Sequence, residues 1–359
     1  MSQTSHGKHV VIVAGGTGGH VYPAIAFAAT WQAKGHRVSW IGTQSGLEAS
    51  IVPKYSIPLH FIQVKGLRGS GKLQQLFSIW GAARAFFQAL KLLQKLQPNV
   101  VLGMGGYVSG PSALAARCLG IPVVIHEQNA IAGKTNQLVA RFAKKVLTAF
   151  PNVLVNRKPV VCGNPIRKDL LAIQPKTHAN SSMNILILGG SRGALSLNKI
   201  LPSLLAQIPD ISIWHQSGEK HFDETQAIYE RQSRGCQRSP DKVVPYIDNM
   251  SQAYEWADVV ICRAGAMTAF EIIAVARPAI FIPFPYAVDD HQTANANYLV
   301  AKDAGMLIQE RDLTIEKLSA LLNSLRDEKN YQRIANNAFT CRTLDADEAI
   351  AQACLEVAT

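Results

Sequence analysis

Four glycines within five positions precede a histidine near the start of the chain, where residues 14–20 read AGGTGGH. Backbone N–H groups approach a ligand closely at glycine, and the first turn of a helix carries partial positive charge, so such a turn suits a phosphate. The imidazole of His20 can take up a proton near neutral pH. We therefore predict an anion-binding turn with His20 as a candidate general base; the alternative is a tight turn followed by a capping or core histidine.

This turn does not match the best-known nucleotide-binding fingerprints. A dinucleotide-binding turn has the spacing GxGxxG and a later acidic residue that holds a ribose, but the second predicted strand (RVSWIG, residues 37–42) ends without one. A Walker A loop requires Gly-Lys-Ser/Thr, which the turn lacks. The sequence thus disfavours an NAD(P)-dependent oxidoreductase.

Two further polar segments follow predicted strands in the same half of the chain. Residues 104–111 (MGGYVSGP) open with glycines, and residues 126–129 (HEQN) follow the apolar run 123–125. Because the carboxyl ends of parallel strands meet at one edge of a sheet, we expect the HEQN segment at the same sheet end as His20. Glu127 can anchor a base, orient a hydroxyl or pair with a lysine, and the sequence does not rank these roles.

The second half of the chain repeats the pattern. Residues 189–194 (GGSRGA) are the counterpart of the first turn, and residues 258–271 (DVVICRAGAMTAFE) read as strand, turn and helix. An acid such as Glu271, one turn into a helix, can accept both hydroxyls of a ribose; a structural helix acid is the alternative. Residues 289–295 (DDHQTAN) suit sugar hydroxyls, but they lack the spaced DxD of metal-dependent sugar transfer, so we expect no metal.

Short apolar runs alternate with helical patterns throughout and must position these turns. Two runs lie within residues 8–16 and 183–190, and each ends at a Gly-Gly pair. The other runs are at 38–41, 59–64, 100–102, 123–125, 146–147, 211–214, 242–244, 258–262 and 279–282; helical patterns include 73–97, 112–119 and 346–357. This alternation predicts an α/β fold with parallel, doubly wound sheets. The 359 residues suffice for two such domains, with a boundary expected near residues 162–169.

Charge is distributed unequally along the chain. Residues 1–165 hold 17 Lys and Arg and only two acids, Glu48 and Glu127, a net charge of +15, whereas the remainder is −4. The first half therefore requires an anionic partner, which leaves nucleic acid, an acidic membrane surface and a phosphorylated ligand open.

Neither a membrane-spanning stretch nor a signal peptide is expected. The six cysteines are scattered, without CxxC or zinc-like spacing, which is typical of buried thiols in a reducing cytoplasm.

In order and spacing, the segments GGTGGH, GGYVSGP, HEQN, GNPIR, GGSRGA, CRAGAMTAFE and DDHQTANA resemble the MurG family of bacterial N-acetylglucosaminyltransferases, from about residue 8 to about residue 355. The resemblance implies the GT-B fold: two Rossmann-like domains facing across a cleft. The N-terminal, acceptor-binding and membrane-associating domain would span residues 1–165, completed by a closing helix at about 343–359. The UDP-GlcNAc-binding domain would span residues 166–342.

The resemblance also implies the reaction. GlcNAc would pass from UDP-GlcNAc, with inversion, to the 4-hydroxyl of the muramoyl sugar of lipid I (undecaprenyl-pyrophosphoryl-MurNAc-pentapeptide), giving lipid II for peptidoglycan synthesis, cell shape and division. No cofactor or metal would take part. The implied partners are both substrates, an anionic membrane surface and other cell-wall synthesis proteins, with no nucleic acid. The implied location is peripheral, on the cytoplasmic face of the inner membrane.

Residue roles follow by the same resemblance. On the donor side, Ile247 would contact uracil and Glu271 the ribose. Ser191, Arg167 and the turn Ala266, Met267, Thr268 and Ala269 would hold the diphosphate, while Gln292 and Asn295 would read the sugar. Phe270 would also belong to the donor site, although it is bulkier than the residue of the family pattern. On the acceptor and catalytic side would lie His20 as base, Glu127 as second choice, Tyr107 and His126, with Thr17, Gly18, Gly19 and Asn129 reaching the donor as well.

The helical pattern 73–97 is the candidate membrane surface. One wide face carries Leu76, Ile79, Trp80, Ala83, Phe86, Phe87, Leu90 and Leu93. Arg84, Lys91 and Lys95 flank this face, and Lys65, Arg68 and Lys72 precede it. Cations that edge an apolar face attract anionic headgroups. We expect part of the face to pack inward and an outer fringe drawn from Ile79, Trp80 and Phe86 to meet lipid.

Three other functions are alternatives. An oxidoreductase is disfavoured by the missing fingerprint, and a non-catalytic nucleotide- or nucleic-acid-binding protein does not explain two matched phosphate turns together with His20. The main alternative is a GT-B relative with another UDP-sugar, another lipid acceptor or UDP-GlcNAc 2-epimerase activity.

Overall fold

The computed structural model describes residues 7–64, 72–190, 193–233 and 242–359, and of residues 72–79 and 233 the backbone alone. The chain divides into two compact units. Unit 1 comprises Met1–Ile166 with Thr343–Thr359, and unit 2 comprises Arg167–Arg342. The first division therefore falls one residue after the position expected from the sequence.

Unit 1 is built on a parallel sheet. Within the described residues the strands lie in the order β3-β2-β1-β4-β5-β6-β7. They are β1 His9–Ala14, β2 Arg37–Gly42, β3 Leu59–Phe61, β4 Val100–Gly105, β5 Val123–Glu127, β6 Lys145–Thr148 and β7 Val160–Val161. The helices are α1 Gly18–Ala33, α2 Glu48–Ile51, α3 Lys72–Leu96, α4 Ser109–Cys118, α5 Lys134–Val139 and α14 Ala346–Val357, with 3-10 turns η1 Val52–Tyr55 and η2 Val155–Arg157.

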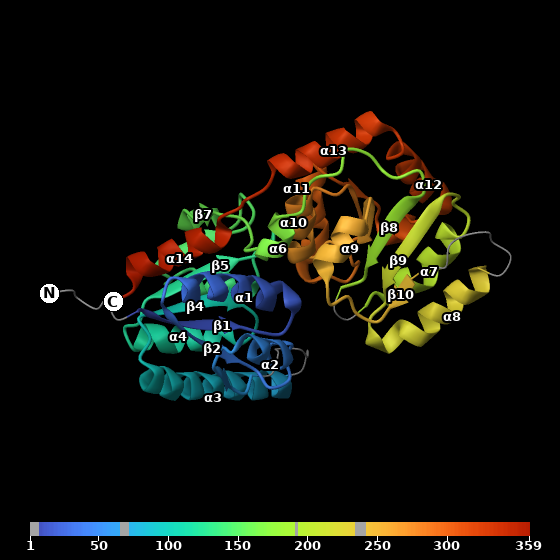
Figure 1. Ribbon diagram of the computed structural model, residues 1–359. Coiled ribbons are helices and arrows are strands. Elements are labelled where there is room, and N and C mark those ends of the chain that lie inside the picture. Colours follow the sequence, from blue (N-terminus) through green and yellow to red (C-terminus); the bar gives the residue numbers. More distant parts are fainter. Residues whose placement is uncertain (1–6, 65–71, 191–192, 234–241) are drawn as a thin grey trace. The chain divides into compact units, whose positions relative to one another are not determined.

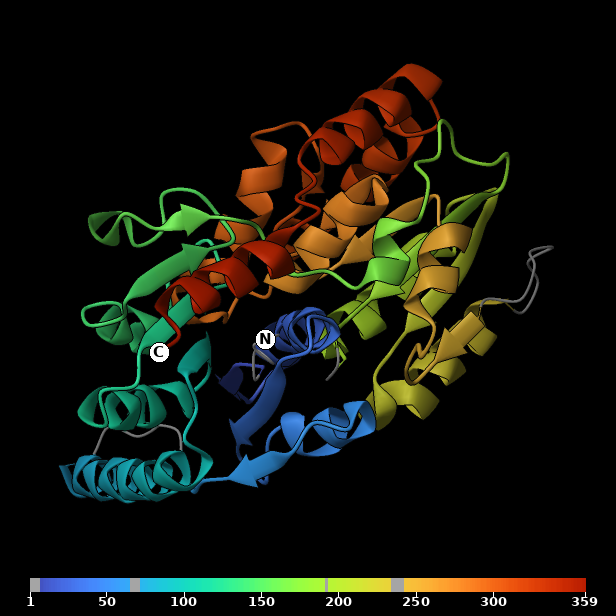
Figure 2. The same ribbon diagram turned by 60° about the vertical axis from the view of Figure 1, so that its left-hand side comes forward.

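Helices cover both faces of this sheet, as parallel strands with apolar residues on both sides require. Figures 1 and 2 show α1 and α14 on one face and α3 and α4 on the other. Alternate residues of β1 divide between the two cores: Val10 and Ile12 face α1 and α14, while Val11 and Val13 face the layer of α3 and α4. The strands thus present their carboxyl ends between two helical layers.

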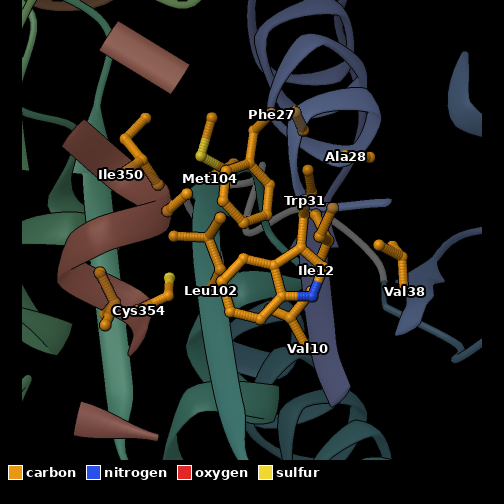
Figure 3. Close-up of a cluster of buried hydrophobic side chains, with 14 of the residues drawn as sticks. Val10, Ile12, Phe27, Ala28, Trp31, Val38, Leu102, Met104, Ile350 and Cys354 are labelled. Atoms are coloured by element: carbon orange, nitrogen blue, oxygen red, sulfur yellow. The ribbon is translucent and has the colours of Figure 1, made fainter. Parts of the chain in front are cut away.

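The closing helix α14 completes the core of unit 1. Figure 3 shows Ile350 and Cys354 of α14 packed with Leu102 and Met104 of β4 and with Phe27 and Trp31 of α1, a cluster of buried side chains. Burying such apolar surface contributes about 25 cal/mol per Å². Removing α14 would therefore expose part of the face that it covers together with α1.

Two ion pairs and one hydrogen bond also hold α14 against the rest of unit 1. Glu348 pairs with Lys34 of α1 at 2.8 Å, Glu356 pairs with Lys145 of β6 at 2.9 Å, and Asp347 accepts a hydrogen bond from the hydroxyl of Thr30. Residues 343–359 carry four acids and no Lys or Arg. The segment thus brings to unit 1 the negative charge that residues 1–165 lack.

Unit 2 is a second parallel sheet, with described strands in the order β10-β9-β8-β11-β12-β13. They are β8 Met183–Leu188, β9 Ile211–Gln216, β10 Lys242–Val244, β11 Val259–Cys262, β12 Ala279–Phe281 and β13 Met306–Leu307. The helices are α6 Lys168–Leu171, α7 Leu195–Leu205, α8 Phe222–Ser233, α9 Met250–Trp256, α10 Ala266–Val275, α11 His291–Val300, α12 Ile315–Ser324 and α13 Glu328–Thr340. Short 3-10 turns are η3 Glu219–His221, η4 Val288–Asp290 and η5 Glu310–Asp312.

The predicted fold class is confirmed: two doubly wound, Rossmann-like sheets in tandem. The strands predicted from apolar runs are present, with ends shifted by up to three residues. Two strands were missed, β7 and β13. Each has two residues and lies at a sheet edge, so neither carries the apolar run by which a buried strand is recognised.

Buried polar groups brace unit 2. The imidazole of His215 on β9 is enclosed: its Nε2–H donates to Asn198 Oδ1 at 3.1 Å, and its Nδ1 lies 3.0 Å from the Tyr229 hydroxyl. Burial lowers the pKa of His215 from 6.5 to about 3.

This lowered pKa predicts acid lability. The folded chain disfavours protonated His215, so its contribution is fully present above pH 6.5 and is lost as pH falls toward 3. The loss at pH 5 is about 2 kcal/mol. Chemical denaturation at pH 7 and pH 5 should show a smaller loss for His215→Gln than for the parent chain. The matched control His178→Gln, at an exposed site, should keep the parent's pH dependence. Equal losses in all three proteins would contradict the assignment.

Candidate functional site

Three loops leave the carboxyl edge of the first sheet from adjacent strands. The strands β1, β4 and β5 are neighbours, so the turns that follow them at residues 15–17, 106–108 and 128–133 meet at one edge. His20 lies in the first turn of α1, Tyr107 in the second loop and Asn129 in the third. The structure therefore brings together the N-terminal residues that the sequence singled out.

Glycines allow these loops to approach one another closely. A Cβ on Gly106, whose φ is +87°, would lie 2.3 Å from the carbonyl oxygen of Gly15. A Cβ on Gly105, with φ +100°, would lie 2.6 Å from Nδ1 of His20. Any side chain at either position would displace the facing group, so the His20 ring rests directly against the β4 backbone.

The HEQN segment is mostly internal. Gln128 and His126 are fully buried, and Gln128 Oε1 lies 3.1 Å from His20 Nδ1. His126 donates from Nε2 to the carbonyl oxygen of Gly163 at 2.8 Å, and burial lowers its pKa to about 4. The ring of His126, which was expected on the acceptor side, is enclosed in unit 1 and bonded at both nitrogens.

Glu127 holds the loop that follows it. Its Oε1 accepts from the Asn129 backbone N–H at 3.0 Å, and its Oε2 accepts from the Gly133 N–H at 3.0 Å and from Asn136 Nδ2 at 2.8 Å. Glu127 as a whole is 2% exposed, and backbone and amide N–H groups occupy both oxygens of its carboxylate. This geometry fits a role that the sequence does not suggest, orientation of the loop, better than the second-choice role as base.

Glu48 was counted in the sequence but given no role. Its buried carboxylate accepts from the Gly16 N–H at 2.9 Å and from the Thr43 N–H and hydroxyl, both at 2.7 Å. A Cβ on Gly15, Gly42 or Gly46 would come within 2.6 Å of its side chain. One internal carboxylate thus organises the glycine turn. Glu48 is one of only two acids in the strongly basic residues 1–165, and this rarity is the signal in the sequence that could have pointed to its role.

Around this carboxylate the glycine turn divides into two parts. The Gly16 N–H points inward to Glu48, whereas Thr17, Gly18 and Gly19 open α1 at the surface. Thr17 is exposed, and its side chain makes no cap hydrogen bond. Tyr107 is 53% exposed beside the turn. An anion at this edge would meet the amides of residues 17–19, not that of Gly16.

In unit 2 the corresponding edge carries the predicted donor residues. Ser191 lies outside the described residues. Met267 and Thr268 are partly exposed in the first turn of α10, where helix N–H groups lack partners within the helix, and Ala266 and Ala269 are buried beside them. Phe270 is buried on the inner side of α10 and faces the core, so its bulk is accommodated there.

Glu271 has an unusual electrostatic setting. Desolvation by the surrounding protein raises its pKa, while the nearby charge of Arg167 and the hydrogen bond from the Tyr254 hydroxyl, at 2.9 Å, act in the opposite direction. A carboxylate that is costly to ionise gains from additional hydroxyl donors. This setting is suited to accepting the two hydroxyls of a ribose.

The remaining donor residues brace loops at this edge. Asn295 is buried and donates from Nδ2 to the Ala264 carbonyl at 3.1 Å, directly before the α10 turn. Gln292 accepts from the Phe284 N–H at 2.9 Å, and the Ile247 side chain is buried. Residues 289–290 precede the helix rather than begin it, since both adopt positive φ and α11 starts at His291.

The predicted apolar face of α3 is partly buried and partly exposed. Ala85, Ala89 and Leu93 are buried, and Phe86 is half-buried against the same core, which leaves it a smaller part of the expected lipid-facing fringe than Trp80. One helical stripe remains exposed: Trp80 (72%), Arg84, Phe87 (59%) and Lys91. These four residues are called the α3 stripe below. The side chains of Lys72 and Ile79 lie outside the described ones.

Known proteins resemble the chain along its whole length. Residues 10–148 match the glycosyltransferase family 28 N-terminal domain, and residues 184–352 match the C-terminal domain of that family. A UDP-N-acetylglucosamine--N-acetylmuramyl-(pentapeptide) pyrophosphoryl-undecaprenol N-acetylglucosamine transferase from Shewanella sp. strain W3-18-1 is 42% identical over 361 aligned residues, 99% of each chain. The relative of the same name from Shewanella oneidensis is equally similar.

Solved structures agree with this similarity. MurG from Acinetobacter baumannii is 39% identical and superposes with a TM-score of 0.82, covering 97% of this chain and 99% of that one. A UDP-GlcNAc 2-epimerase from Neisseria meningitidis, bound to UDP-GlcNAc, is 14% identical with a TM-score of 0.66, covering 97% and 100%. The second likeness shows the fold alone.

The buried position of Glu48 predicts a stability effect. In Glu48→Gln the amide nitrogen cannot accept from the Gly16 or Thr43 N–H groups, so a buried donor is left unpaired at a cost of about 1–3 kcal/mol. Chemical denaturation of the full chain measures this. The matched control Glu348→Gln removes only an exposed ion pair and should cost less than about 1 kcal/mol. Parent-like stability of Glu48→Gln would refute the role.

Proposed function

This chain belongs to the MurG family within glycosyltransferase family 28, and we propose on that premise how its residues carry out the reaction. The protein transfers N-acetylglucosamine from UDP-N-acetylglucosamine to lipid I, undecaprenyl-pyrophosphoryl-N-acetylmuramyl-pentapeptide, and makes lipid II for peptidoglycan synthesis. Full-length similarity to curated transferases of this name is the observation that carries the assignment.

Unit 1 binds the acceptor in this proposal. Two features support it: residues 1–165 carry a net charge of +15, and the amides of residues 17–19 open α1 beside His20 and the exposed Tyr107. A pyrophosphate is attracted to such a helix terminus. The diphosphate of lipid I would lie against Gly18 and Gly19, with its sugar near His20.

Unit 2 binds the donor. Arg167 and the first-turn amides of α10 hold the diphosphate, together with Ser191. Glu271 accepts the ribose hydroxyls, in line with its desolvated setting. Ile247 contributes to the uracil site, and Gln292 and Asn295, which brace the loops before α10 and α11, contribute to the sugar site.

His20 is the general base. As the acceptor hydroxyl attacks C1 of the donor sugar, its proton passes to the imidazole, the new O–C1 bond forms, and the electron pair of the broken C1–O bond leaves with UDP. Attack from the face opposite UDP inverts the anomeric centre. Helix-terminal amides and Arg167 stabilise the charge that develops on UDP without a metal ion.

Transfer of radiolabelled GlcNAc to a short-chain lipid I analogue tests this mechanism. His20→Ala should lower kcat by about 10²- to 10⁴-fold, the range for loss of a general base, and leave the affinity for UDP-GlcNAc unchanged. His178→Ala, at an exposed site, is the control and should turn over like the parent. EDTA should have no effect. Intact nucleotide binding without transfer would refute the function, and full activity of His20→Ala would remove His20 from its role.

The α3 stripe is the proposed membrane contact. Among the described residues, no helix combines the length and apolarity needed to span a bilayer. The stripe alternates aromatic and cationic side chains along one exposed face, an arrangement suited to the headgroup region of an anionic membrane. We infer that the protein reaches its lipid acceptor from the cytoplasmic face in this way.

Vesicle sedimentation tests the stripe. Because each Lys or Arg near an anionic surface contributes about 1 kcal/mol, the double variant Arg84→Glu, Lys91→Glu should weaken binding to phosphatidylglycerol vesicles by roughly 30-fold or more. Trp80→Ser with Phe87→Ser should weaken it at all salt concentrations. The control Arg311→Glu, Lys329→Glu reverses two exposed charges of unit 2 and should bind normally. Binding insensitive to salt and to both stripe variants would contradict the proposal.

A further inference from the structure

A chain of hydrogen bonds runs from His20 into the interior of unit 1. His20 Nδ1 lies 3.1 Å from Gln128 Oε1, Gln128 Nε2 lies 3.1 Å from His126 Nδ1, and His126 Nε2 lies 2.8 Å from the carbonyl oxygen of Gly163. We call this chain the His20 relay. The mechanism above uses only its first member.

Two carbonyl oxygens determine the direction of every bond in the relay. The Gly163 carbonyl can only accept, so His126 carries its proton on Nε2 and presents a lone pair at Nδ1. The Gln128 amide nitrogen faces that lone pair and also the His126 backbone carbonyl, at 3.1 Å, which again can only accept. Both amide hydrogens are thereby used, and the side-chain oxygen of Gln128 points to His20.

The state of His20 follows from this orientation. Gln128 Oε1 can only accept, so the neutral imidazole of His20 carries its proton on Nδ1 and leaves the lone pair on Nε2. Without such a partner, a neutral imidazole favours the opposite tautomer, with the proton on Nε2. We propose that Gln128 is a positioning residue that holds His20 in the Nδ1–H tautomer, so that Nε2 receives the proton of the acceptor hydroxyl.

The surroundings make the relay rigid. Gln128 is fully buried, Met104 Sδ lies 4.0 Å from its amide nitrogen, and its backbone carbonyl accepts from Asn164 Nδ2 at 3.1 Å. The absence of a side chain at Gly105 lets the His20 ring lie in line with Gln128. The pKa of His126, lowered to about 4 by burial, keeps that ring neutral and its Nδ1 an acceptor throughout the neutral range.

The partner of His20 is thus an uncharged amide, although the carboxylate of Glu127 is one residue away in the sequence. Glu127 is directed to Asn129, Gly133 and Asn136 instead. An amide oxygen orients the imidazole with less electrostatic stabilisation of its protonated form than a carboxylate gives.

The proposal rests on His20 acting as base, and nitrogen NMR separates the two claims. In full-length protein labelled with ¹⁵N-histidine at pH 8, the His20 resonances, identified by their loss in His20→Ala, should show a protonated Nδ1 and a bare Nε2. In Gln128→Leu the pattern should move toward a protonated Nε2. Turnover should fall on the order of 10-fold or more, since wrong-tautomer imidazoles are poor bases, with an unchanged KM for UDP-GlcNAc.

Two further variants keep the test decisive. Gln137→Leu makes the same substitution on α5, where the side chain donates only to the Ala132 carbonyl, and should change neither spectrum nor turnover. Gln128→Glu keeps an acceptor oxygen toward His20 and should retain the Nδ1–H tautomer and lose less activity than Gln128→Leu.

The outcomes are distinguishable. A protonated Nε2 in the parent protein, or an unchanged tautomer in folded Gln128→Leu, overturns the proposal whatever the kinetics. If Gln128→Leu does not fold, the His20 tautomer in the parent protein and in Gln128→Glu still tests the proposal. A third outcome is a switched His20 tautomer in Gln128→Leu together with full turnover in both Gln128→Leu and His20→Ala. This outcome supports the relay and overturns the assignment of His20 as base.

Discussion

Close contact between backbone segments is the constraint on which the catalytic edge of unit 1 depends. Gly106 lies against Gly15, and Gly105 lies against the His20 ring, at distances that no Cβ could occupy. These contacts bring three loops to one point and align His20 with Gln128. The sheet supplies the adjacency of the strands, and the absence of side chains at Gly105 and Gly106 sets how closely the loops and the His20 ring approach one another.

The acids of unit 1 fall into two groups, those buried within residues 1–165 and those carried by α14. Glu48 and Glu127 are buried and satisfied by N–H groups and amides, not by lysine or arginine. The acids of α14 pair with Lys34 and Lys145, on the α1 face of the sheet. On the opposite face, covered by α3 and α4, Arg84 and Lys91 lie exposed on α3.

Much of the fold could be predicted because strand and helix periodicity are local properties. The two-residue edge strands could not be predicted in this way. The inner side of α3 could not be predicted either, because Phe86 and Phe87 are neighbours of the same type, and only Phe86 packs against the core between α3 and the sheet. The site residues can be proposed from their type and order. Their contacts could not be predicted, because His126, Glu127 and Gln128 share one polar segment, and only the folded chain separates an amide that faces His20 from a carboxylate that holds a loop.

The return of the chain to unit 1 has a consequence for biogenesis. Ile350, Ala351 and Cys354 belong to the same buried cluster as Val10 and Ile12 of β1, and the Asn99 side chain donates a hydrogen bond to the backbone carbonyl of Thr359. Unit 2 lies between the two segments of unit 1 in the sequence, so during synthesis all of unit 2 precedes α14. Before α14 emerges from the ribosome, the sheet of unit 1 exposes the area that this helix covers. A nascent chain stalled before α14 would thus combine a closed second domain with an open, aggregation-prone first one.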